Sequence, residues 1–161
     1  MDLAAYTERY PPQPPAKPAG AQDAQRQLTV EEGMGFLPDA ATAMIPARRP
    51  GGREGCHLWV IIPSDVRFIL EVAPNVRPPP LSLGVAKHTN LTGGGPACCG
   101  GEVWLDPANA RKLYATGGSG RYPPKNLAQL QDAITVFTAY GFEVVCPGWD
   151  EDNDIAERVF R

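Results

Sequence analysis

Short runs of apolar and β-branched residues, separated by turn residues, fill the middle of the chain and predict β-strands. Residues 56–62 and 66–72 form two such runs, and the Pro-Ser-Asp sequence at 63–65 is a turn signal, so we expect a hairpin. The three prolines at 78–80 are expected to form a rigid crossover after this hairpin. Further short strands are expected at 83–91, 102–106, 112–116 and 142–146.

One amphipathic helix is expected near the C-terminal end. Asn126 and Gln129 follow two prolines and have the spacing of a capping box, and Gly141 is a stop signal. Shorter helical turns are expected to begin at Thr29 and near Asp39. Together these elements predict an α+β domain with a small, curved, mostly antiparallel sheet and the long helix on one face. The apolar residues at helical spacing are Leu127, Leu130, Ile134, Phe137 and Tyr140.

The first 27 residues differ from the rest of the chain in composition. They contain no Val, Ile, Phe or Trp, and five prolines fall between positions 11 and 18. Such a segment has little apolar area to offset the entropy of ordering, so we expect a flexible Pro-rich arm over 1–27 and a single α+β domain over 28–161. A protein partner could bind this arm as an extended ligand, or bind the acidic surface.

The charge and hydropathy of the chain exclude several classes of function. With 161 residues and a net charge of -3, the chain lacks the basic balance of a general nucleic-acid binder. It has no apolar run long enough for a membrane span and no signal-peptide pattern at its start. We therefore expect a soluble, cytoplasmic protein with no membrane partner, and export by a specialised secretion system stays open.

Residues 87–124 bring polar side chains next to repeated glycines, which suits a ligand site because glycine lets the backbone approach a ligand closely. His88 could act as a general acid or base, with Glu102 as its orienter and Tyr122 as a third catalytic residue. The amides of the glycine loop at 117–120 could bind an anion, with Arg121 adding charge. The residues expected to bind the ligand are Asn90, Ser119, Gly120 and Arg121.

Purely structural interpretations of these positions also remain open. His88 could be a structural histidine that bonds a turn carbonyl, and Glu102 an ordinary exposed strand residue. The glycine loop matches neither a dinucleotide fingerprint nor a phosphate-binding Walker loop, because the third glycine and the Gly-Lys-Ser/Thr sequence are absent. The alternating aspartates at 150–154 resemble the start of a calcium loop but lack its glycine and its final glutamate.

The four cysteines show no paired metal-ligand spacing, so we expect reduced thiols, no metal and no cofactor. A second interpretation makes Cys98 or Cys99 a nucleophile, with His88 as its base. Both thiols stand in a short loop between a proline and two glycines.

Three motifs in 86–124 resemble poorly characterised modules of bacterial effector and toxin-like proteins. They are His-Thr-Asn-Leu-Thr-Gly-Gly from His88, Gly-Gly-Glu ending at Glu102, and Ser-Gly-Arg-Tyr-Pro from Ser119. Those modules carry a histidine before a small-Leu-x-Gly turn, then Ala-Gly-Glu, then Ser-Gly-His-Tyr-x-Pro, so Arg121 replaces a second histidine here. The resemblance implies an effector setting and names no reaction.

Two functions follow as expectations. In the first, an effector or toxin-type domain acts on or binds a nucleotide-like or phosphate-bearing ligand in a cleft. In the second, the protein is a non-enzymatic binding module, such as an immunity or adaptor protein, and the glycines only shape turns. Convergence of His88, Glu102 and Tyr122 on one pocket would favour the first.

Overall fold

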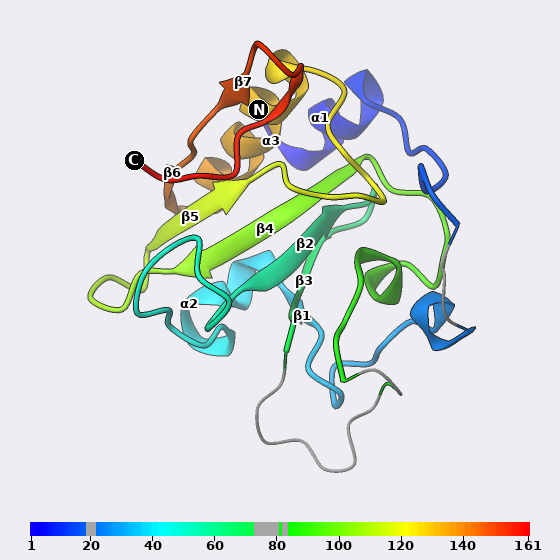
Figure 1. The fold of residues 1–161 in the computed structure, drawn as a ribbon, viewed down its shortest axis with the longest axis horizontal. Helices are drawn as coiled ribbons and strands as arrows, with labels where there is room; N and C mark the ends of the chain where they lie inside the picture. Colours follow the sequence, from blue (N-terminus) through cyan, green and yellow to red (C-terminus); the bar gives the residue numbers. More distant parts are fainter. Residues whose placement is uncertain (19–21, 73–80, 82–83) are drawn as a thin grey trace.

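A computed structural model describes residues 1–18, 22–72, 81 and 84–161 and shows a six-stranded sheet (Figure 1). The strands lie in the order β1-β3-β2-β4-β5-β6, and every neighbouring pair is antiparallel except β5 and β6. The α+β class and the mostly antiparallel sheet are confirmed. The strands are β1 Gly35–Phe36, β2 His57–Ile61, β3 Val66–Leu70, β4 Cys99–Leu105, β5 Lys112–Thr116 and β6 Glu143–Val145.

The helices are short apart from α3, which spans Leu127–Ala139. The Asn126 side chain caps it by accepting a hydrogen bond from the backbone N–H of Gln129, and Gly141 follows its end at φ +90°. No helix in the described ranges is long and apolar enough to cross a membrane. The other elements are α1 Leu3–Arg9, η1 Gln22–Gln25, η2 Leu37–Asp39, α2 Ala40–Ala43, η3 His88–Leu91 and a small hairpin of β7 Trp149–Asp150 with β8 Ile155–Ala156.

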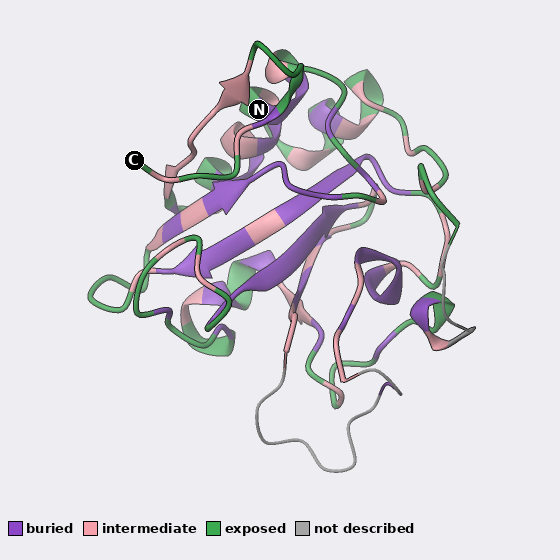
Figure 2. Cartoon of the chain, in the orientation of Figure 1, coloured by how far each residue is buried: buried purple, intermediate pink, exposed green. Residues whose placement is uncertain are grey.

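The helices α1, α2 and α3 cover one face of the sheet. Alternate residues of the strands point to this face, among them Trp59, Val103 and Leu113, and all three are buried. The ring of Phe137 from α3 meets the indole of Trp59 edge-on at 5.1 Å. Figure 2 shows the central strands as the most continuously buried part of the chain, so the sheet and α3 share the main core.

The opposite face of the sheet is covered without a long helix. Near β2 and β3 the segment from 84 to 97 packs on it, with Leu91 burying against Leu58 and Val60. Near β5 the C-terminal tail folds back, and the ring of Phe160 meets Trp104 edge-on at 5.7 Å. The middle of this face, between the two coverings, is where a cavity forms.

The N-terminal segment corrects the expectation of a flexible arm. Residues 3–9 form α1, which lies beside α3 (Figure 1) and buries Tyr6 completely in the core. The hydroxyl of Tyr6 lies 3.0 Å from the Cys99 thiol, and Tyr10 donates to Asp132 of α3 at 2.7 Å. This segment lacks Val, Ile, Phe and Trp, but the ring of Tyr6 supplies the buried apolar area that docks it on the core.

Two other local expectations are also wrong. The helix expected from Thr29 is a turn, in which Glu32 and Thr29 bond each other as in a cap while Gly33 at φ +111° ends it. The strand expected at 83–91 is replaced over its last four residues by η3, because Asn90 bonds the Lys87 backbone locally. The proline crossover at 78–80 and residue 83 lie outside the described residues.

Candidate functional site

A cavity of about 300 Å³ opens on the sheet face opposite α3 and brings together four of the residues expected from the sequence. Glu102 of β4 forms part of its floor, and His88 lies at the start of η3 beside it. Gly120 and Arg121 reach it from the loop between β5 and α3. Residues separated by more than thirty positions along the chain therefore share one pocket.

His88 is buried and neutral. Its Nε2 lies 2.8 Å from the Gly101 carbonyl oxygen, and because a carbonyl only accepts, the proton sits on Nε2 and Nδ1 is left as an acceptor. Burial lowers the pKa of His88 to about 4. The ring lies against Gly100, where a Cβ would come within 3.2 Å of its Cδ2.

This geometry corrects the role expected of Glu102 as the orienter of His88. The imidazole is held by a backbone carbonyl of β4, and the Glu102 carboxylate is engaged elsewhere. Its Oε1 lies 3.7 Å from the guanidinium of Arg158, and its Oε2 accepts from the Cys56 thiol at 3.5 Å. Burial raises the pKa of Glu102, so this carboxyl holds a proton more readily than an exposed glutamate.

Cations from four separate segments surround these groups. Lys17, Lys87, Arg121 and Arg158 all line the pocket. Within the described residues no ion pair engages Lys17, Lys87 or Arg121. Arg158, Arg121 and Lys87 each help to lower the pKa of His88, so their positive charge acts inside the pocket. The rim of the pocket is therefore suited to an anion.

Tyr122 does not line this pocket. Its hydroxyl donates to the Gly95 carbonyl oxygen at 2.7 Å and lies 2.7 Å from the Thr92 hydroxyl. Burial raises its pKa. Tyr122 therefore holds the glycine turn after η3 in place, and it lies outside the pocket that contains His88 and Glu102.

Asn90 and Ser119 direct their polar atoms to the backbone of neighbouring loops. The Asn90 side chain accepts from the Lys87 backbone at 2.8 Å and donates to two carbonyl oxygens of the segment around η1. The Ser119 hydroxyl accepts from the backbone N–H groups of Arg121 and Tyr122. Both residues shape the loops that present His88 and Arg121, and neither lines the pocket.

The thiol interpretation does not match this geometry. Cys98 and Cys99 are buried outside the pocket, and burial raises the pKa of Cys99 to about 12. A thiol with so high a pKa stays protonated and is a poor nucleophile. Among the described residues no group of three or more His, Cys, Asp or Glu side chains is arranged to hold a metal ion.

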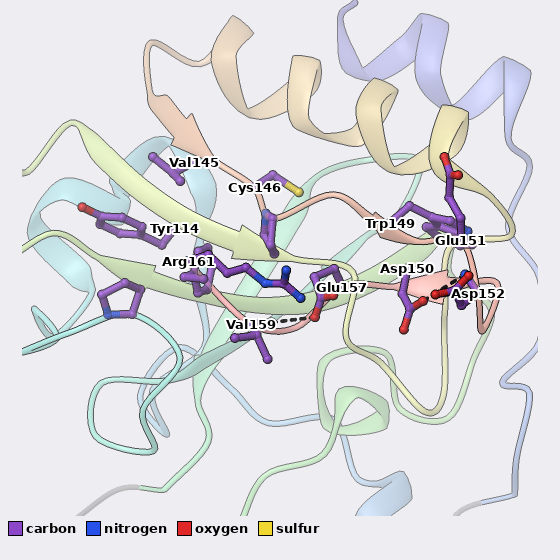
Figure 3. Close-up of a pocket in the computed structure, with 13 residues that line it drawn as sticks. Tyr114, Val145, Cys146, Trp149, Asp150, Glu151, Asp152, Glu157, Val159 and Arg161 are labelled. Atoms are coloured by element: carbon purple, nitrogen blue, oxygen red, sulfur yellow. Dashed lines mark hydrogen bonds between the residues drawn. The ribbon is translucent and has the colours of Figure 1, made fainter.

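A second cavity of about 850 Å³ lies along β6 and the C-terminal tail and has the opposite charge. In Figure 3 Asp150, Glu151 and Asp152 gather near Trp149 at one end, and Tyr114 lies at the other. Asp150 closes a turn by accepting from the backbone of Asp152, so the calcium-like spacing serves a local turn. Because carboxylates dominate this cavity, it does not suit a phosphate.

Four charged residues of the smaller pocket were missed from the sequence: Lys17, Glu71, Lys87 and Arg158. Lys17 lies in the segment interpreted as a flexible arm, and Arg158 in the tail. Glu71 is the penultimate residue of a predicted strand, where a lone carboxylate carries no distinguishing pattern. Their only shared signal is charge, and charge at these positions is ordinary for a surface.

Comparison with models of protein families, with curated proteins and with solved structures found no match to this chain. What the protein does therefore has to follow from the chemistry of the pocket.

Proposed function

We propose that the protein is a bacterial effector or toxin-type domain whose pocket binds, and acts on, a nucleotide-like or phosphate-bearing ligand. The observation that carries the proposal is the shared pocket of His88, Glu102 and Arg121, with Lys17 and Lys87 at its rim. The resemblance of 86–124 to effector and toxin-like modules supports the setting.

The groups in the pocket have complementary chemistry. Near neutral pH Nδ1 of His88 is unprotonated and can accept a proton, as a weak base because of its low pKa. The raised pKa of Glu102 makes its carboxylate a stronger proton acceptor, which suits a group that binds a hydroxyl and exchanges its proton. Lys17, Lys87 and Arg121 would hold the negative charge of a phosphate and stabilise any charge that builds up on it.

The non-enzymatic binding module is the second candidate, favoured by one observation. The turns around the pocket are held by the polar atoms of Tyr122, Asn90 and Ser119. This is expected if the motif that contains these residues only shapes the fold. This candidate explains the turns and leaves the cations that line the pocket with His88 without a role.

The first prediction separates the two candidates by activity. Purified protein is incubated with a panel of nucleoside phosphates, products are separated by chromatography, and growth is followed after expression in a bacterial cytoplasm. His88→Ala and Glu102→Gln should each lower turnover about 100-fold or more, as for loss of a general acid or base, and should relieve growth arrest. Glu151→Gln, a neutralised carboxylate of the other cavity, is the control and should behave as the wild type.

The same assay can refute the enzyme. Wild-type activity in the His88→Ala protein, with its circular dichroism unchanged, would remove the catalytic proposal. Binding of a nucleoside phosphate with no turnover in the wild type would favour the binding module.

A further inference from the structure

Two carboxylates and a group of cations line the pocket, and they come from different elements. Glu71, which directly follows β3, and Glu102 of β4 stand on the strands that flank β2, and both line the cavity. Cys56, at the start of β2, lies between them: its thiol donates to Glu102, and both carboxylates help to raise its pKa. The acidic group is therefore built into the sheet.

Backbone hydrogen bonds fix the acidic group further. The N–H of Glu71 donates to the Cys56 carbonyl at 3.0 Å, and the Glu71 carbonyl accepts from Ala86 at 2.8 Å. Gly118 covers Glu102 so closely that a Cβ there would lie 2.6 Å from Oε1. The backbone that carries Glu71 and the surroundings of Glu102 are thus in place before a ligand arrives, which reduces the entropy cost of binding.

The cationic group is formed where the N-terminal segment meets the loop after β5. The N–H of Ala16 donates to the Arg121 carbonyl at 2.7 Å, and the Arg121 guanidinium donates to the Pro18 carbonyl. Lys17 stands between these two contacts and lines the pocket with Arg121. Backbone contacts therefore hold two cations near each other, with no carboxylate paired to either in the described part of the chain.

A ligand that satisfies both groups carries an anion at one end and hydroxyl groups at the other. An ionised carboxylate only accepts hydrogen bonds, so Glu71 and Glu102 select donors, and vicinal sugar hydroxyls are donors that acidic residues bind in nucleotide sites. A second phosphate would be repelled there. The volume of about 300 Å³ is at the small end for ligand pockets and suits a single phosphorylated sugar.

We infer that the pocket recognises a ribose 5-phosphate unit, with Lys17 and Arg121 holding the phosphate and Glu71 and Glu102 holding the sugar hydroxyls. This inference rests on the proposed function, since it names the ligand class of the same site. Arg158 would leave Glu102 when a hydroxyl takes its place, which its exposed side chain and long contact of 3.7 Å allow.

Calorimetric titration with inorganic phosphate, ribose 5-phosphate and AMP tests the inference, which is the second prediction. Ribose 5-phosphate should bind about tenfold more tightly than phosphate, the scale of one or two hydrogen bonds to a charged group. Glu71→Gln should remove that advantage and leave the phosphate Kd unchanged, whereas Lys17→Gln should weaken both ligands about fivefold or more. Glu151→Gln should match the wild type.

The outcomes distinguish this inference from the function it rests on. Phosphate binding without a preference for ribose 5-phosphate, or an equal effect of Glu71→Gln on both ligands, would overturn the sugar assignment alone. Absence of binding for all three ligands would overturn the proposed function as well. AMP that binds at least as tightly as ribose 5-phosphate would assign the unit to a nucleotide, and exclusion of AMP would assign it to a free sugar phosphate; both support the inference.

Discussion

The two histidines of the chain show how the environment of a residue decides its chemistry. His88 and His57 are both buried, and burial lowers the pKa of each to about 4. Nδ1 of His57 lies 2.9 Å from the Gly55 carbonyl oxygen, and His57 does not line the pocket. His88 has the same protonation state but lines the pocket together with Glu102, so position separates the candidate base from the core residue.

The third prediction follows from these two pKa values. Between pH 6.5 and about 4 the unfolded chain binds protons at both histidines and the native protein does not, so the free energy of unfolding should fall as the pH falls. Urea unfolding at about pH 5 should show a loss of about 2 kcal/mol per histidine relative to about pH 7. The raised pKa of Glu102 works in the opposite direction and offsets part of it.

His57→Gln supplies the control for this measurement. It removes one titrating group and should reduce the pH-dependent loss by about half, whatever its effect on stability at neutral pH. An undiminished loss in this variant would show that other groups dominate the acid sensitivity.

At the scale of the elements, two glycines near the paired strands β4 and β5 leave no room for a side chain, each for a different reason. A Cβ on Gly101 of β4 would lie 1.8 Å from the Thr116 carbonyl oxygen, which is backbone of the paired strand. A Cβ on Gly118 would meet Oε1 of Glu102 at 2.6 Å, the far end of a flexible side chain. The first glycine therefore serves the sheet and the second serves the pocket.

The fourth prediction compares these two glycines. Gly101→Ala should cost about 3 kcal/mol of stability, because a strand must move to make room. Gly118→Ala should stay within about 1 kcal/mol but displace the Glu102 carboxylate and weaken ribose 5-phosphate binding about tenfold. Urea unfolding and calorimetry measure the two effects; a Gly118→Ala protein that binds normally would show that the position of Glu102 is not critical.

For the whole molecule, the N-terminal segment joins the core to the pocket. Tyr6 anchors α1 in the core, and residues 13–18 then run past Ala97 and Arg121 to place Lys17 at the rim. The anchor and the cation lie eleven residues apart in one chain segment. Stability and ligand binding should therefore depend on the same docked segment.

The fifth prediction tests this docking. Tyr6→Ala should cost about 4 kcal/mol, as for other buried aromatic residues, because it leaves a cavity beside α3. Glu8→Ala, at an exposed position of the same helix, should change stability by less than about 0.5 kcal/mol. Thermal unfolding measures both effects. Equal melting temperatures for Tyr6→Ala and the wild type would show that the N-terminal segment is a flexible arm.

The sequence determined the elements whose signals are local. The hairpin of β2 and β3, the strands β4 and β5 and the cap at Asn126 all follow from hydrophobic periodicity and turn chemistry within a few residues. The placement of His88, Glu102 and Arg121 beside glycine turns also came from short motifs. Where a signal depended on distant partners, as for Tyr6 against Cys99, local composition was misleading.

Only the tertiary structure decided which polar groups meet. The strand order β3-β2-β4 sets Glu71 and Glu102 on either side of Cys56, and the docked N-terminal segment and tail add Lys17 and Arg158. It also turned Tyr122 away from the cavity. Periodicity reports which face of an element is buried, but a pocket depends on which segments, far apart in the chain, pack side by side, and that is set by the free energy of the whole fold.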